Sequence, residues 1–388
     1  MPLRRHFLAS ASAIAALSLF ATGPARADTP IPVVATFSIL GDMVERIGGE
    51  HVTVQSLVGP NGDTHVYQPT PAAARAVQGA EILVVNGLEF EGWLDRLAEA
   101  SGFDGTLVVA TTGVEPIAYE DGHDDHHGEE HAGHDDHDDH DAQHTEHDDH
   151  DHGAEHAGHD DHDPDHDHDH AEEHAGDDHG DAHAGYDHGE EHAIHDDHGH
   201  DEDHADHHGH DHGAFDPHAW QSLDNAVIYV DNITAALAQA DPANAATFQE
   251  NRAAYVAEIE ALDAEIHAMM NALPEAQRTI VTSHDAFQYF GRDYDLTFVA
   301  PQGLSTESEA SAKNVAELIE HMREEGVSAV FLENISDSRL LEQIARETGA
   351  SIGGTLYPGA LSGPDGPAAT YLDMMHHNAT TLSGALGS

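Results

Sequence analysis

Cysteine, positive charge and long apolar runs are all scarce or missing in this 388-residue chain. With no cysteine, neither disulfide bonds nor thiolate ligands are available, so any metal ion must be held by imidazole and oxygen ligands. Only 13 Lys and Arg stand against 74 Asp and Glu, which argues against nucleic acid and anionic membranes as partners and favours cations. After the N-terminal residues, no segment approaches eighteen uninterrupted apolar residues, so we expect no permanent membrane span.

Residues 1–27 are typical of a cleaved export signal. Arg4 and Arg5 precede an apolar run over 7–20, and the stretch 25–27 (Ala-Arg-Ala) supplies a small-x-small cleavage site. The paired arginines also resemble a twin-arginine signal, which would imply export after folding; an ordinary secretory signal is the alternative. The sequence therefore predicts an extracytoplasmic protein of the periplasm.

Most of the negative charge and most of the histidine lie in one segment, residues 120–213. Between Glu120 and Asp211 there are 37 acidic residues and no Lys or Arg, so of the formal net charge of −61 only −24 lies outside this stretch. Thirty of the 39 histidines lie between His123 and His212. Because it has few apolar residues, we predict that this segment is disordered without metal and binds several divalent ions weakly. A solvated acidic linker is the alternative.

Two blocks on either side of this insert alternate short apolar runs with amphipathic segments. In the first, strands are predicted over 32–37, 51–58, 81–85 and 106–110, and helices over 39–47, 72–77 and 90–100. In the second, strands are predicted over 279–282, 296–299 and 329–332, and helices over 286–290, 311–324, 338–348 and 371–386. This alternation predicts an α/β protein with two lobes, each a mostly parallel sheet flanked by helices.

Residues 241–274 are predicted to join the lobes as one long, rigid helix. Asp241-Pro242 is a typical helix start with proline at the first helical position, and Pro274 lies just past the expected end. About 30 helical residues at 1.5 Å each would make a rod of roughly 45 Å. The predicted lobes are then an N-terminal one over 28–119 and 214–240 and a C-terminal one over 275–388.

Three histidines outside the insert lie in unusual local sequences. His65 lies in a turn-rich loop after a strand, His218 precedes a helix directly after the insert, and His284 follows the first strand of the second block. Each of them alone would more often be structural. Open α/β sheets, however, bind ligands at the carboxyl ends of their strands, so we expect both lobes to contribute these imidazoles to one cleft.

The sequences around these histidines resemble three metal-ligand motifs of the cluster A-I solute-binding proteins, which serve zinc and manganese ABC importers. They read Gly-Asp-Thr-His-Val-Tyr-Gln-Pro at His65, Asp-Pro-His-Ala-Trp at His218 and Ser-His-Asp-Ala-Phe at His284. The resemblance covers essentially all of the mature chain and implies these three histidines as metal ligands. It implies zinc as the transported ion, because manganese members usually carry glutamate at the position of His284. A His-rich acidic insert at this place also occurs chiefly in zinc-binding members, and the motifs are most similar to the Azt-type branch.

The chain departs from the family at the usual fourth ligand. The family normally has an aspartate in a segment resembling Leu-Tyr-Ser-Asp-Ala-Leu-Ser, whereas this chain has Leu-Tyr-Pro-Gly-Ala-Leu-Ser, with Gly359 at that position. We expect three imidazoles and a water around zinc, with Asp365 from the same loop as second choice. A histidine of the insert is a further alternative.

The sequence thus predicts a zinc-capturing transport protein, not an enzyme, that acts as a monomer and delivers zinc to the membrane permease of an ABC transporter. A periplasmic zinc chaperone is a further candidate partner. The alternative function is a periplasmic zinc buffer or chaperone. A zinc-dependent hydrolase ranks much lower: three imidazoles and a water also occur in such enzymes, but the chain has no His-Glu-x-x-His motif and no P-loop.

Overall fold

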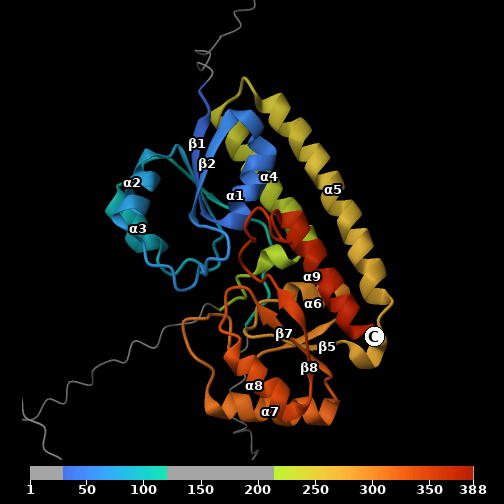
Figure 1. Ribbon diagram of the computed structural model, residues 1–388. Helices are drawn as coiled ribbons and strands as arrows, with labels where there is room; N and C mark the ends of the chain where they lie inside the picture. Colours follow the sequence, from blue (N-terminus) through green and yellow to red (C-terminus); the bar gives the residue numbers. More distant parts are fainter. Residues whose placement is uncertain (1–28, 120–213, 388) are drawn as a thin grey trace, which may run out of the picture. The chain divides into compact units, whose positions relative to one another are not determined.

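The computed structural model describes residues 29–119 and 214–387. The predicted signal peptide and the predicted insert lie outside these ranges, so the expectations about both remain predictions. Within the described ranges, no helix combines the length and the apolar character that crossing a membrane requires. The described chain forms two α/β lobes connected by a long helix (Figure 1), as the strand and helix pattern predicted.

The N-terminal lobe contains a four-stranded parallel sheet in the order β2-β1-β3-β4. Its strands are β1 (Ile31–Phe37), β2 (Val52–Val58), β3 (Ile82–Val85) and β4 (Thr106–Val109). The central strands β1 and β3 are almost entirely buried, as expected for a parallel sheet covered on both faces. The covering helices are α1 (Ser38–Gly48) and α4 (Leu223–Ala240), which pack on each other, and α2 (Pro71–Gly79) with α3 (Leu94–Ser101).

The C-terminal lobe repeats this arrangement with a parallel sheet in the order β6-β5-β7-β8. Its strands are β5 (Thr279–Val281), β6 (Thr297–Val299), β7 (Ala329–Glu333) and β8 (Ser351–Leu356). Its helices are α6 (Gln288–Tyr294), α7 (Ala312–Glu325), α8 (Arg339–Thr348) and α9 (Tyr371–Leu386). In both sheets the first strand of the lobe lies inside the sheet, so the loops that follow the central strands converge on one end of each lobe.

Strand β8 was missed by the sequence pattern because two glycines interrupt it. A Cβ at Gly353 would lie 2.6 Å from Cε1 of Phe331, and one at Gly354 would lie 2.6 Å from Cγ2 of Thr381. Gly354 also has a φ of +147°. Because β8 packs closely against both β7 and α9, glycine is required at these positions. The strand therefore lacks the bulky apolar residues by which a strand is recognised in a sequence.

The long helix α5 spans Ala245–Asn271, and the prediction that Asp241-Pro242 begins it is wrong. Asp241 instead ends α4 and folds its side chain over the following turn. Its Oδ1 accepts from the backbone N of Ala243 (3.2 Å) and its Oδ2 from Nδ2 of Asn244 (2.7 Å). Asn244 is then the N-cap, and 27 helical residues make a rod of about 40 Å.

Helix α5 packs against α1 and α4 of one lobe and against α6 and α9 of the other. Its buried side chains, which recur every three to seven residues along one face, are Phe248, Tyr255, Ile259, Leu262, Ile266 and Met270. Burial of each such side chain contributes about 1.5–3 kcal/mol. The main apolar cluster also runs from Phe37 and Trp220 in the first lobe to Leu356 and Tyr371 in the second, so the lobes share one core.

Candidate metal centre

His65 lies in the loop between β2 and α2, which is pinned to the start of α3. The indole Nε1 of Trp93 donates to the carbonyl of Thr64 at 2.8 Å, and the rings of Trp93 and Tyr67 meet edge to face at 4.9 Å. The carboxylate of Asp63 accepts from the backbone N of His65 at 2.9 Å. His65 is held in place on both sides and is only 9% exposed.

His218 precedes a short 3-10 helix, Ala219–Gln221, and is completely buried. Asp216 Oδ1 lies 2.8 Å from Nδ1 of the His218 ring and accepts from the His218 backbone N at 2.9 Å. The side chain of Asn86, directly after β3, donates to the carbonyl of Pro217 at 2.9 Å. The segment before α4 is thereby fixed to the end of the N-terminal sheet.

His284 follows β5, and its closest partner is Glu333 at the end of the neighbouring strand β7. Glu333 Oε1 accepts from the backbone N of Ser283 (2.9 Å) and of His284 (3.1 Å), while Oε2 lies 2.6 Å from Nδ1 of His284. Both side chains are fully buried. The adjacent ends of two parallel strands therefore set the orientation of this imidazole.

The structure brings His65, His218 and His284 together, with one ring nitrogen of each within 4.8 Å of the others. Nε2 of His65 lies 3.3 Å from Nε2 of His218, and Nε2 of His284 is buried with no hydrogen-bond partner. Two imidazole nitrogens on a tetrahedral zinc at 2.0–2.1 Å would be about 3.4 Å apart. Within the described ranges, this is the one group of three or more His, Asp or Glu whose geometry could hold a metal ion.

Two carboxylates lie behind these rings and fix which nitrogen faces the centre. Asp216 binds Nδ1 of His218, and Glu333 binds Nδ1 of His284, so the Nε2 lone pair of each ring is left for a cation. A carboxylate in this outer position also makes the imidazole a stronger donor. Neither residue was predicted from the sequence to take part in the site. Asp216 could have been noticed two positions before His218, but nothing local connects Glu333 with His284.

The protonation of the three histidines differs. Burial, reinforced by the neighbouring histidines, holds the pKa of His65 and of His218 well below its usual range, so both rings are neutral at neutral pH. Burial also lowers the pKa of His284, but the Glu333 carboxylate raises it more, and the net pKa lies above the usual value. Burial raises the pKa of Asp216 to about 7. A cation at the centre would favour neutral His284 and ionised Asp216, so its binding would release protons.

An aromatic wall formed by Phe90 and Trp220 closes one side of the centre. Phe90 contacts the ring of His65 at a centroid distance of 4.9 Å, and Trp220 contacts that of His218 at 5.2 Å. A Cβ at Gly359 would lie 3.6 Å from Trp220 Cζ2 and 4.0 Å from Phe90 Cζ. Gly359 therefore lies against this wall, whereas Asp365 is exposed and lies outside the histidine group.

Known proteins match nearly the whole chain. The iron-binding protein YfeA of Yersinia pestis is 26% identical over 380 residues, which cover 98% of this chain and 94% of that protein. The manganese-binding lipoprotein MntA of Halalkalibacterium halodurans is 26% identical over 366 residues, covering 94% and 91%. Among solved structures, the periplasmic zinc-binding protein TroA of Treponema pallidum has a TM-score of 0.66 at 21% identity, covering 92% and 99%.

These matches place the chain in the class of metal-binding substrate-binding proteins of ABC-type metal uptake, as the resemblance predicted. A family profile described as zinc-uptake complex component A, periplasmic, matches residues 33–385, and the chain belongs to this family. Proteins of this class work with a membrane permease. Membership in the Azt-type branch stays a prediction.

Proposed function

We propose that this protein captures zinc with high affinity outside the cytoplasmic membrane and delivers it to the permease of an ABC importer. The observation that supports this most directly is the convergence of three buried imidazoles with no carboxylate among the inward-facing donors. His65, His218 and His284 are the proposed ligands. A water molecule is the proposed fourth ligand, because Gly359 has no side chain and Asp365 is exposed.

The choice of zinc rests on the donor set, since the relatives are named for iron, manganese and zinc alike. Manganese favours sites rich in carboxylate and water oxygens, whereas imidazole suits zinc. The two carboxylates next to the centre already bind Nδ1 atoms and strengthen the imidazoles. An ion held by three neutral rings also keeps its positive charge, which suits a cargo that must be released again.

Competition with a chromogenic chelator tests the proposal. The full chain should hold one zinc ion much more tightly than manganese. His284→Ala should weaken that event by at least about a hundredfold, because zinc without three protein ligands is poorly held. His321→Ala is the matched control, since His321 is exposed on α7. Full affinity in His284→Ala, or equal affinity for manganese, would contradict the proposal.

A further inference from the structure

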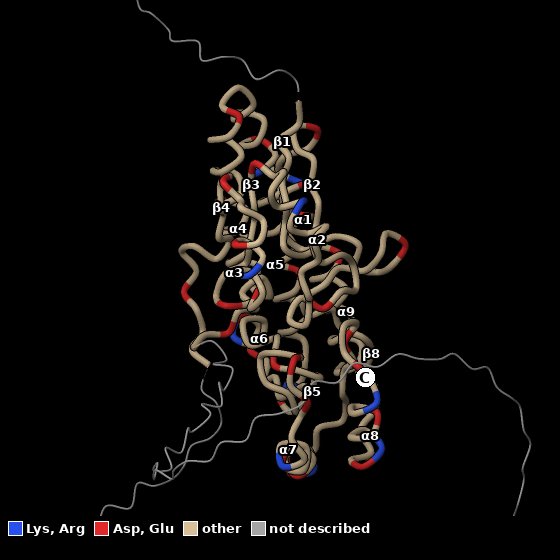
Figure 2. The backbone as a smooth tube through the Cα atoms, turned by 90° about the vertical axis from the view of Figure 1, so that its left-hand side faces the viewer, with Lys and Arg blue, Asp and Glu red and all other residues tan. Residues whose placement is uncertain are grey.

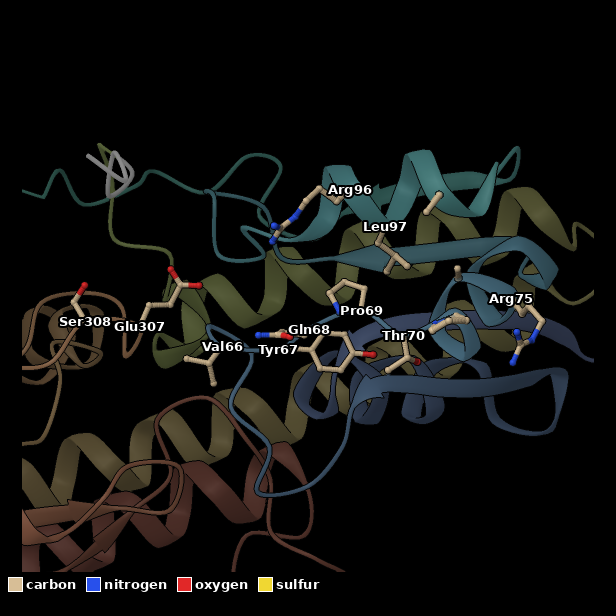
Figure 3. Close-up of a pocket in the computed structure, with 13 residues that line it drawn as sticks. Val66, Tyr67, Gln68, Pro69, Thr70, Arg75, Arg96, Leu97, Glu307 and Ser308 are labelled. Carbon is tan, nitrogen blue, oxygen red and sulfur yellow. The ribbon is translucent and has the colours of Figure 1, made fainter. Parts of the chain in front are cut away.

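A cavity of about 1150 Å³ is lined by the loop residues that directly follow His65, from Val66 to Thr70 (Figure 3). Its apolar surface includes Tyr67, Pro69 and Leu97. Two arginines line it as well, Arg75 from α2 and Arg96 from α3. Because these two side chains define its chemistry, we call it the Arg75–Arg96 pocket.

The C-terminal lobe completes this pocket. Glu307 and Ser308, from the loop between β6 and α7, line it opposite the two helices of the N-terminal lobe (Figure 3). The hydroxyl of the preceding residue, Thr306, donates to Asp63 at 2.5 Å, two residues before His65. The pocket is therefore built from both lobes. It directly adjoins the loop that carries the proposed ligand His65, which we call the metal loop.

Basic residues are sparse along the described chain (Figure 2). Most of those within the described ranges already have an acceptor. Six pair with a carboxylate, namely Arg46, Arg252, Arg278, Arg292, Lys313 and Arg339. Arg323 donates to the carbonyl of Glu347. Arg75, Arg96 and Arg346 are the described basic residues that make no such interaction, and two of these three line the same pocket.

The chemistry of the pocket suits an acidic peptide segment better than a small molecule. Both arginines are exposed, so they would meet carboxylates of an incoming surface without a large desolvation penalty. The apolar surface between them suits an apolar side chain on the same segment. The cavity exceeds the volume of roughly 300–1000 Å³ that is typical of small-molecule sites. Glu307 lines the pocket from the C-terminal lobe. Its negative charge disfavours a carboxylate of the bound segment at that end of the pocket, and this would fix the direction in which the segment lies.

We propose that the Arg75–Arg96 pocket is the docking site for an acidic segment of the membrane permease. This inference rests on the proposed transport function and adds to it the place and the chemistry of the contact. Because both lobes line the pocket next to the metal loop, a bound segment contacts the parts of the protein that hold the ion. The permease contact and the site of metal release would therefore be neighbouring parts of one surface.

Zinc uptake by spheroplasts that lack their own copy of this protein tests the proposal. Purified, zinc-loaded full chain is added, and the initial rate of radioactive zinc uptake is measured against protein concentration. For Arg75→Glu/Arg96→Glu we expect the half-maximal concentration to rise at least about tenfold, because a charge at a contact rim acts on association. The maximal rate should be retained. Arg346→Glu, an exposed and unpaired arginine on α8, is the matched control and should resemble the wild type.

Two further measurements separate this inference from the alternatives. The half-maximal concentration of the wild type should rise with salt more steeply than that of the double variant, because salt screens exposed charges. Zinc affinity in solution should be the same in all three proteins. If the double variant transports as the control does, the docking site is wrong. If instead citrate raises the melting temperature of the wild type alone and uptake is unaffected, the pocket binds a small carboxylate and the proposal is overturned. If the wild type supports no uptake, the transport function itself fails.

Discussion

Restoring a carboxylate at Gly359 is the change that probes the centre most directly. Gly359 is buried against Phe90 and Trp220, the two rings that pack on His65 and His218. The nearest atoms to an added Cβ lie at 3.6 and 4.0 Å, which are ordinary contacts. Gly359 is also absent from the residues with positive φ, so the backbone accepts a side chain without strain. We expect Gly359→Asp to fold and to tighten zinc binding.

The expected gain is one to two orders of magnitude, or about 1.4–2.8 kcal/mol. An anionic ligand in place of water is the source of this gain. In the absence of zinc, the same carboxylate is buried beside aromatic rings, and the indole Nε1 of Trp220 already donates to the carbonyl of Pro358 at 2.8 Å. Burial without a partner should raise the pKa of the new aspartate and destabilise the metal-free protein by about 1–3 kcal/mol.

Chelator competition at about pH 8 and thermal melts of the metal-free protein measure the two effects. Gly359→Asn is the matched control, because it has nearly the same volume without the charge. Gly359→Ala tests the added Cβ alone and should change little. Tightening by Asp but not by Asn is the expected result. If Asp leaves both the affinity and the melting temperature unchanged, residue 359 does not face the metal and its alignment to the fourth ligand of the family is mistaken.

Three further outcomes follow from the structure. Glu333→Gln should weaken zinc binding about tenfold to a hundredfold at about pH 8, and it should also lower the pKa of His284, measured by NMR titration; unchanged affinity would show that the carboxylate is not needed to orient this ring. Asp42→Asn should raise the melting temperature at about pH 8 but not at about pH 4. Burial raises the pKa of Asp42 from 3.8 to about 6. Ionisation of Asp42 therefore lowers the free energy of unfolding of the wild type as the pH rises from about 4 to 6, by up to about 3 kcal/mol above pH 6. Equal melting temperatures of the two proteins at about pH 8 would contradict this. Deleting residues 121–213 should lower the number of zinc ions bound but retain the most tightly bound ion. Loss of that ion would place the main site in the insert.

Local sequence patterns were enough for most of the fold. Short runs rich in apolar residues, separated by amphipathic segments, predicted all strands except β8. The runs that form the central strands β1 and β3 are almost continuously apolar because these strands are buried in a parallel sheet. The errors came from tertiary constraints. Gly353 and Gly354 exist because β7 and α9 press against β8, and α5 begins late because the side chain of Asp241 holds a turn.

The sequence by itself determined the kinds of donor at this site. Because the chain has no cysteine, the donors had to be imidazole and oxygen, and the motifs that resemble those of the family pointed to His65, His218 and His284. Only the tertiary structure decided that their nitrogens meet, since 153 residues separate the first two. The same holds for Glu333 behind His284 and for the arginines left unpaired beside the metal loop. Such contacts depend on how distant elements pack, and local periodicity carries no information about that packing.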